Sequence, residues 1–259
     1  MLFGISTYLA PQKERLTLAW LERARDAGFT RVELFAERPS LDYRDRSQLV
    51  DLGRWFRDSP LVPHALHTPP TANIADPDRA HRDEVKRALE VLEHVPCQYV
   101  VQHFGGRDDL YHGKRIDAAY SALEELNPFA RDRGAAILLE NGASELAGPA
   151  GLVRFLELTR LGNGVSFDVG HAHLRGGVED GFHSLEPYIR SIHVHDNDGL
   201  SDGHLLPQTG KIGWRSTMHL LQQRQELVLV AAVRDSGEWA QPAVAVHDAL
   251  SRLMDIEEP

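Results

Sequence analysis

The chain has 259 residues, of which 42% are hydrophobic and 25% charged, a composition typical of a globular protein rather than a disordered or fibrous one. Its 28 Lys and Arg against 38 Asp and Glu make the net charge −10, which argues against a strong electrostatic grip on nucleic acid phosphates. The single cysteine, Cys97, excludes an internal disulfide and a cysteine-based metal site, and it fits a reducing, cytoplasmic setting. Since no apolar run is long enough for a membrane span and the first residues lack the basic start of a signal peptide, we expect no membrane association.

Eight short apolar runs recur along the chain and predict eight strands. They begin at Leu2, Arg31, Val62, Gln98, Ala136, Gly164, Ile189 and Leu227 and read LFGIST, RVELFA, VPHALH, QYVVQHF, AILLEN, GVSFDV, IRSIHVH and LVLVAAV. Most of these runs are nearly continuous in their apolar character, as expected of parallel strands that are buried on both faces.

Amphipathic segments lie between these runs and predict helices. Apolar residues at helical spacing occur in residues 16–27, 85–92 and 116–123, and Gly28 follows the first of these segments as a stop. The repeated alternation of strand and helix predicts an α/β fold, a single (β/α)₈ TIM barrel formed by one domain of residues 1–259. A doubly wound open sheet is the alternative, but no glycine-rich phosphate loop follows the first strand.

Polar residues gather at the carboxyl ends of the predicted strands. They are Glu33, His64, His67, His103, Glu140, Asp168, His171, His193 and His195, with Asp202 and His204 in the long connection of residues 196–213. A second long connection, residues 68–78, follows the third strand. Because the carboxyl ends of the strands carry the active site of such a barrel, we expect these side chains to converge on one cavity.

These polar residues differ in how strongly they indicate a metal site. We expect His64 to be a structural histidine near the barrel wall and His173 to be a loop histidine bonded to a carbonyl. Glu140 follows four apolar residues and would be costly to bury without a cation, a salt bridge to an arginine being the alternative. His193 and His195 are two residues apart, so both side chains leave the same face of one strand. Imidazoles and carboxylates without thiolates suit Zn, Mn or Fe, and one bridging carboxylate can hold two ions.

Several motifs resemble those of the xylose-isomerase-like barrels, the superfamily that includes endonuclease IV and the sugar epimerases. The matching segments span nearly the whole chain and read GISTYLA, LHTPP, QHFGG, LLENG, FDVGHAHL and HVHDNDGLSDGHLLPQTGKIGW. The resemblance implies one to three divalent ions, Zn or Mn, and a carbohydrate-like substrate that is isomerised or epimerised, namely a sugar, sugar acid or sugar phosphate.

The endonuclease IV-like members imply a ligand set for three ions. Carried over to this chain, the sets are His67, His103 and Glu140, then Asp168, His193 and Glu140, and finally His171, Asp202 and His204. His193 takes the place of the family histidine because HVHDN then matches H-x-x-D-N. This leaves His195 as a second-choice ligand or a substrate contact, while Glu140 or a histidine such as His195 would move the substrate proton.

The eighth strand departs from the family pattern. The family has a metal-binding glutamate at its end, where this chain has Val230 or Ala232, and the nearest carboxylate, Asp235, lies beyond the strand. One half of the epimerases' acid/base pair is thereby missing.

Three functions stay open. The net charge favours an isomerase or epimerase, and the three ligand sets favour an endonuclease IV-like phosphodiesterase acting on nucleic acid. The missing glutamate favours a non-catalytic barrel that binds metal or sugar. The sequence predicts no oligomeric state.

Overall fold

A computed structural model describes residues 1–11, 13–106 and 108–256 of the chain. Eight parallel strands form a closed barrel in which each strand pairs with the next and β8 pairs with β1. The strands are β1 (Leu2–Ser6), β2 (Arg31–Phe35), β3 (Val62–His67), β4 (Tyr99–His103), β5 (Ala136–Glu140), β6 (Gly164–Asp168), β7 (Ile189–Val194) and β8 (Val228–Ala231). Each lies within the apolar run that predicts it, so the (β/α)₈ barrel is confirmed.

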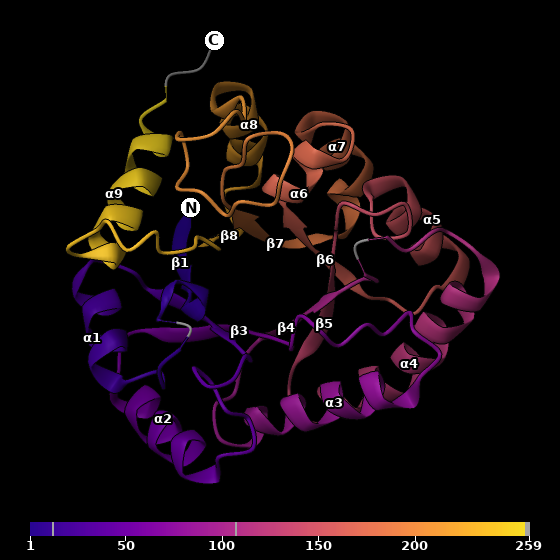
Figure 1. The fold of residues 1–259 in the computed structure, drawn as a ribbon, viewed down its shortest axis with the longest axis horizontal. Helices are drawn as coiled ribbons and strands as arrows, with labels where there is room; N and C mark the ends of the chain where they lie inside the picture. The colour runs from indigo at the N-terminus through magenta and orange to yellow at the C-terminus, as the bar shows by residue number, and fades with distance from the viewer. Residues whose placement is uncertain (12, 107, 257–259) are drawn as a thin grey trace.

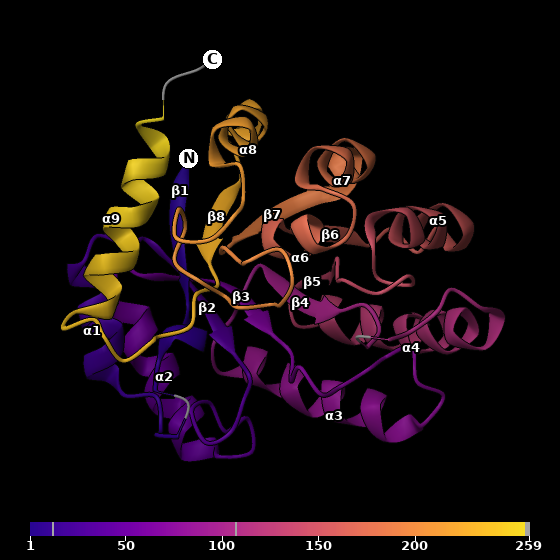
Figure 2. The same cartoon turned by 45° about the horizontal axis from the view of Figure 1, so that its top comes forward.

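The helices form an outer layer around the strands (Figure 1). They are α1 (Leu18–Asp26), α2 (Arg46–Asp58), α3 (Arg79–Leu89), α4 (Gly113–Arg131), α5 (Pro149–Thr159), α6 (Val169–Leu174), α7 (Val178–Leu185), α8 (Trp214–Leu221) and α9 (Pro242–Met254). The last helix, α9, closes the ring beside α1, so the two ends of the chain complete one layer (Figure 2).

The predicted apolar stripes are the faces that these helices bury against the barrel. In α3 the buried residues are Val85, Ala88 and Leu89, and α4 buries Ile116 and Leu123 in the same manner. Burial of such a stripe supplies most of the stability of a helix in a globular protein. Among the described residues, no helix combines the length and the apolarity that crossing a bilayer requires.

Two irregularities in strand register decide which side chains enter the barrel. The pairing of β2 with β3 shifts between Val32 and Glu33, where His64 is the extra residue of β3. The pairing of β6 with β7 shifts between Val165 and Ser166, where Arg190 is the extra residue of β7. Such bulges re-aim side chains and are frequent next to functional sites. Both shifts lie upstream of the polar strand ends.

Candidate metal centre

Three donors from adjacent strands form the first group, which we call the strand cluster: His67, His103 and Glu140. They end β3, β4 and β5, and the register pairs His103 directly with Glu140. Glu140 Oε2 lies 3.1 Å from Nε2 of His67 and 2.9 Å from Nε2 of His103. One donor atom from each residue lies within 4.8 Å of the others, so the three can share an ion. This is the first of the three ligand sets that the family resemblance implies.

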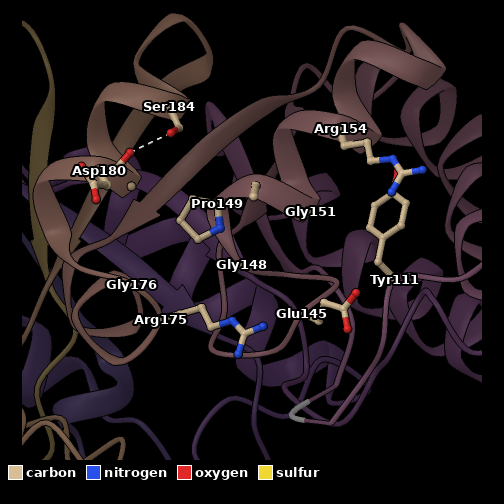
Figure 3. A pocket seen from close by; sticks show the side chains of 12 residues that line it. Tyr111, Glu145, Gly148, Pro149, Gly151, Arg154, Arg175, Gly176, Asp180 and Ser184 are labelled. Atoms are coloured by element: carbon tan, nitrogen blue, oxygen red, sulfur yellow. Dashed lines mark hydrogen bonds between the residues drawn. The ribbon is translucent and has the colours of Figure 1, made fainter.

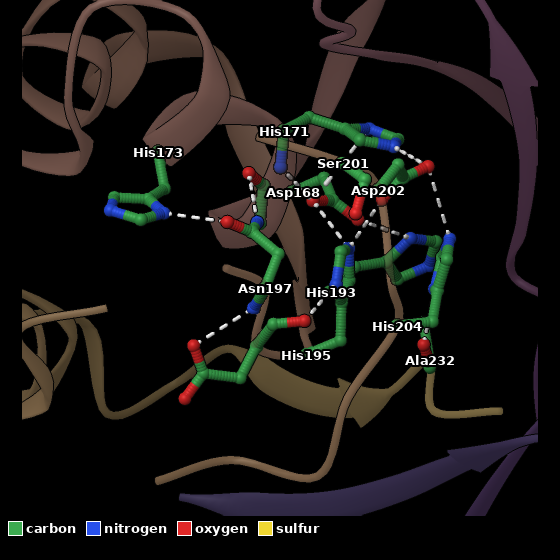
Figure 4. A network of polar contacts seen from close by, with 12 residues as sticks. Asp168, His171, His173, His193, His195, Asn197, Ser201, Asp202, His204 and Ala232 are labelled. Carbon is green, nitrogen blue, oxygen red and sulfur yellow. Dashed lines mark hydrogen bonds and ion pairs between the residues drawn. The ribbon is translucent and has the colours of Figure 1, made fainter. Parts of the chain in front are cut away.

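Four donors form a second group, the loop cluster: His171, His195, Asp202 and His204 (Figure 4). Asp202 Oδ2 lies 3.1 Å from Nε2 of His171 and 3.3 Å from Nε2 of His204. His195 Nε2 lies 3.8 Å from the other oxygen of Asp202 and 3.1 Å from Oδ1 of Asp168. Asp202 and His204 thus turn inward and meet His171, with His195 as a fourth donor beyond the implied set.

Asp196 holds the long connection that carries Asp202 and His204. Its fully buried carboxylate accepts a hydrogen bond of 2.7 Å from the indole Nε1–H of Trp214 and one of 3.1 Å from the backbone N–H of Ile212. Its backbone forms an antiparallel bridge with Leu205, next to His204. Hydrogen bonds to Asp196 therefore join the beginning and the end of the connection of residues 196–213, and the segment between them places Asp202 and His204 over the barrel.

Two glycines permit close approaches within this region. A Cβ added at Gly170 would lie 2.0 Å from the imidazole of His195, and one at Gly210 would lie 2.3 Å from Oδ1 of Asp196. Real Cβ atoms do not come so close to other heavy atoms, so only glycine fits at either position. Gly170 makes room for a histidine of the loop cluster, and Gly210 makes room for the carboxylate that holds the loop.

Backbone carbonyls orient four of the histidines. The Nδ1 atoms of His67, His171, His195 and His204 face the carbonyl oxygens of Thr68, Asn141, Asp196 and Ala232 respectively. Since a carbonyl only accepts, Nδ1 carries a hydrogen, and Nε2 is the nitrogen that can offer a lone pair to an ion. In each case Nε2 is the nitrogen that faces the cluster, which is the arrangement of metal-binding histidines in proteins.

The expected second ligand set, Asp168, His193 and Glu140, is arranged differently. The donor atoms of Glu140 and Asp168 group with His171 rather than with His193. His193 bridges two carboxylates, with Nδ1 2.8 Å from Glu140 Oε1 and Nε2 2.8 Å from Glu33 Oε2. His193 Nδ1 is 3.8 Å from Asp168, so it faces this set without being one of the grouped donors.

Charge pairing shifts the pKa values around the strand cluster. Burial alone would raise the pKa of Glu140, but the facing His103 and His193 lower it well below its ordinary value. Burial would likewise lower the pKa of His193, yet Glu33 and Glu140 raise it well above its ordinary value. Glu140 is thus held as a carboxylate, the form that binds a metal ion.

In the loop cluster, charge pairing also outweighs burial in setting the pKa values, except at His204. Burial lowers the pKa of His171, but Asp168 and Asp202 outweigh this effect and raise it to about 10. Burial would raise the pKa of Asp202, whereas His171 and His204 lower it. The pKa of His204 itself is lowered by burial and by the adjacent His195. Without an ion, the raised pKa therefore keeps the His171 ring protonated beside Asp202.

The donors fit a divalent cation on a further observation. Oδ2 of Asp168 and Oδ1 of Asp202 are buried and have no hydrogen-bond partner among the described residues. A buried carboxylate oxygen without a partner is costly, and a cation bound beside it would remove that cost. The combination of imidazole nitrogens and carboxylate oxygens suits Zn or Mn.

A cavity of about 420 Å³ opens onto these groups at the carboxyl end of the barrel. Its lining includes donors of both clusters, an apolar wall made of Tyr8, Phe35 and Pro70, and Ala232 directly after β8. Of the described residues that line it, Arg234 alone carries a Lys or Arg side chain. Ala232 offers no ligand where the family has a glutamate, and Asp235 does not line the cavity.

His64 and His173, the two histidines expected to have structural roles, and a second cavity lie apart from this centre. His64 is buried with Nε2 3.1 Å from the hydroxyl of Ser191, and His173 faces the side-chain oxygen of Asn197 at 2.7 Å. The second cavity, about 400 Å³, lies between α5 and α7, where Arg154 stacks over the ring of Tyr111 (Figure 3). The described residues that line it include no histidine, so they offer no comparable metal site.

Sequence reasoning left several residues of the site without a role. Glu33 stands out only as a polar strand end, and nothing in the sequence shows that it contacts His193. Asp196 follows HVH within a polar stretch typical of a turn, which conceals that its carboxylate is fully buried. Arg234 and Tyr8 lie at opposite ends of the chain and meet through hydrogen bonds at the cavity rim.

The fold and these donors define a (β/α)₈ barrel with a candidate histidine–carboxylate metal centre at the carboxyl ends of its strands. The chain belongs to the xylose isomerase-like TIM barrel family, whose model matches residues 21–253. The family predicted from the motifs is therefore confirmed.

Two relatives illustrate the range of this family. An uncharacterized protein of Methanocaldococcus jannaschii, MJ1311, is 26% identical over 278 residues, covering 99% of this chain and 90% of the relative. The probable endonuclease 4 of Haloquadratum walsbyi is 27% identical over 186 residues, covering 67% of this chain and 56% of the relative.

Solved structures agree with the fold. A D-tagatose 3-epimerase-like protein superimposes with a TM-score of 0.81 at 22% identity, covering 99% of this chain and 98% of the other. The IOLI protein, solved with a bound zinc atom, superimposes with a TM-score of 0.80 at 18% identity over the same shares of the two chains. At these identities the likeness establishes the barrel alone.

Proposed function

We propose that this chain, acting as a single domain of residues 1–259, is a metal-dependent isomerase or epimerase of a sugar, sugar acid or sugar phosphate. The observation that carries the proposal is the position of the strand cluster, whose three residues all line a cavity of about 420 Å³. A cavity of that size matches a small-molecule site. The epimerase-like and zinc-bound structures with the same fold support the choice.

Different residues around the cavity would bind the metal ion and the substrate in such a reaction. When bound, a divalent ion polarises the substrate carbonyl and makes the neighbouring C–H more acidic. His67, His103 and Glu140 would hold one ion, and the loop cluster would hold another. The guanidinium of Arg234 would meet substrate hydroxyls or an anionic group at the rim, while Tyr8 and Phe35 would pack against the carbon skeleton.

Proton transfer would fall to Glu140 rather than His195. Glu140 lines the cavity, whereas His195 is fully buried and is not among the lining residues. The carboxylate would take the proton from the carbon beside the carbonyl, and the C–H electron pair would form the C=C bond of an enediol as the carbonyl oxygen gains a proton from solvent. Return of the proton to the former carbonyl carbon, with loss of the O–H proton from the other enediol oxygen, gives isomerisation. Protonation of the original carbon on its opposite face by a solvent proton, with loss of the O–H proton gained by the carbonyl oxygen, gives epimerisation.

Solvent deuterium exchange tests this proposal even while the product is unidentified. Zn- or Mn-loaded protein would be incubated in D₂O with a panel of ketoses, aldoses and their phosphates and acids, and followed by proton NMR. Loss of the signal of the C–H beside the carbonyl is the expected result, and Glu140→Gln should abolish it. A panel without any exchange by the metal-loaded protein would contradict the proposal.

A second function rests on the loop cluster. It could place a further ion close to the strand cluster, and the relative from Haloquadratum walsbyi bears an endonuclease name. Nucleic acid would then be the partner, and a metal-activated water would attack the phosphodiester. The net charge of −10 opposes this function, as does a cavity whose described lining offers Arg234 as its one Lys or Arg side chain. Metal-dependent cleavage of a duplex with an abasic site, in the absence of deuterium exchange, would favour it.

A further inference from the structure

Glu33 is a buried carboxylate to which the proposed reaction assigns no role. Its side chain is 1% exposed, and its Oε2 accepts a hydrogen bond of 2.8 Å from Nε2 of His193. Its other oxygen, Oε1, has no hydrogen-bond partner among the described residues. Burying a carboxylate is costly unless it is paired. The reason for placing one here must therefore lie at His193.

The backbone is shaped to put Glu33 in this position. The register of β2 against β3 shifts immediately before Glu33, so that it opposes Ala65 on β3 and Ser6 on β1. A bulge of this kind redirects a side chain, and the two small neighbours leave room for the longer one. Glu33 thereby lines the same cavity as the strand cluster.

His193 differs from the four histidines that backbone carbonyls orient. Those four donate Nδ1–H to a carbonyl and turn Nε2 toward the clusters. In His193 the arrangement is reversed, because Nε2 is bonded to Glu33 and Nδ1 faces Glu140 at 2.8 Å and Asp168 at 3.8 Å. A carboxylate takes the place of the carbonyl, and it brings a full negative charge to the far side of the ring.

We propose that Glu33 is a positioning residue of the metal centre: it keeps a hydrogen of His193 on Nε2 and so turns Nδ1 toward Glu140 and Asp168, where that nitrogen can add to the ligands of an ion held by the two carboxylates. The proposal rests on the metal binding of the proposed function. A carboxylate behind a ligating histidine fixes its orientation and strengthens its basicity. Glu33 thus contributes negative charge from β2 in a cavity where the residue after β8 is Ala232.

Substitutions at Glu33 and a matched substitution nearby test this role. Glu33→Leu removes the acceptor, and Glu33→Gln keeps an acceptor oxygen without the charge. Glu37→Gln is the matched control: it makes the same chemical change at another carboxylate of the cavity lining, one that has no hydrogen bond or ion pair with a histidine among the described residues. The zinc dissociation constant and the number of bound ions would be measured by competition with a chromophoric chelator. The Co(II) absorption spectrum would report the geometry and ligand field of the metal centre.

We expect Glu33→Leu to weaken zinc binding by about 10- to 100-fold at one ion and to change the Co(II) spectrum. Glu33→Gln should give a smaller loss in the same direction, and Glu37→Gln should match the wild type. Circular dichroism of the metal-free variants would establish whether they fold. If Glu33→Leu does not fold, the zinc affinity and the Co(II) spectrum of Glu33→Gln test the positioning role.

Unchanged zinc affinity and an unchanged Co(II) spectrum in the folded Glu33 variants would overturn the positioning role, even if their thermal stability falls, because a purely structural ion pair predicts that pattern. In that event the wild type still binds metal, and the proposed function stands. A wild type that binds no zinc would overturn both proposals together.

Discussion

The strand cluster and the loop cluster use the same chemistry but are held in place by different means. Each donor of the strand cluster ends a strand, and barrel register alone brings His103 beside Glu140. The loop cluster takes Asp202 and His204 from a long connection whose two ends are joined by the hydrogen bonds of the buried Asp196. The strand cluster should therefore persist as long as the barrel folds, whereas the loop cluster can be lost by itself.

Glu140→Gln is expected to have the largest effect, because Glu140 is the carboxylate shared by the strand cluster. Loss of an outer-sphere partner alone weakens metal binding by about 10- to 100-fold, so loss of this ligand should cost at least about 100-fold in affinity and remove activity. Elemental analysis and the deuterium exchange assay measure both. Glu37→Gln serves as the control for metal retention in the same cavity. Full metal retention in Glu140→Gln would show that the carboxylate is an ordinary ion-pair partner.

Asp196→Ala should separate the two clusters. It leaves the Trp214 indole N–H and the Ile212 amide without their buried acceptor, at an expected loss of about 2–3 kcal/mol in the free energy of unfolding. The variant should bind fewer ions than the wild type but keep the one at the strand cluster. Urea unfolding and ion counting provide the measurements.

Asp198→Ala is the matched control, since Asp198 only accepts local hydrogen bonds from Leu200 and Ser201 in the same connection. If Asp196→Ala bound as many ions as Asp198→Ala does, the loop cluster would not depend on the hydrogen bonds of the Asp196 carboxylate.

The pH dependence of metal binding should reveal the proton that the loop cluster holds. The pKa of His171 is raised to about 10, so its ring is protonated at pH 7 and must lose that proton before Nε2 can bind an ion. Zinc affinity should therefore rise with pH by about tenfold per unit between pH 7 and 9 for this one proton.

Calorimetry in buffers of different ionisation enthalpy would count the released protons. Asp202→Asn removes one of the charges that raise the pKa of His171 and one ligand, so the remaining zinc binding should be weaker and depend less on pH. An equally steep dependence in that variant would assign the proton elsewhere.

At His64, a histidine of β3 outside both clusters, we expect an effect on stability and none on metal binding. Burial lowers its pKa to about 4, so the ring is neutral in the folded protein. Between pH 6.5 and 4 the unfolded chain binds this proton while the folded chain does not, and stability falls as pH decreases, by at most about 1.4 kcal/mol per pKa unit. The difference in unfolding free energy between the wild type and His64→Gln, both metal-free, should therefore shrink toward low pH. A difference that stays constant with pH would mean that His64 is charged in the fold.

The chain sequence by itself determines the barrel and the composition of the candidate metal centre. The eight apolar runs can only be buried as parallel strands covered by the amphipathic segments between them, and the carboxyl ends of such strands converge. That convergence is enough to bring His67, His103 and Glu140 together, because they end three consecutive strands.

Only the tertiary structure decides which partners the other histidines and carboxylates of the site contact. His193 and His195 are equivalent by the two-residue repeat of a strand, but in the fold His195 occupies the space beside Gly170 and joins the loop cluster, while His193 contacts Glu33. The contact between Glu33 and His193 joins strands that are far apart in the sequence, and it depends on a one-residue register shift that no local pattern encodes. Long-range register and side-chain depth in a closed barrel arise from the packing of all eight strands at once, which is why the site's partners emerge only in the folded chain.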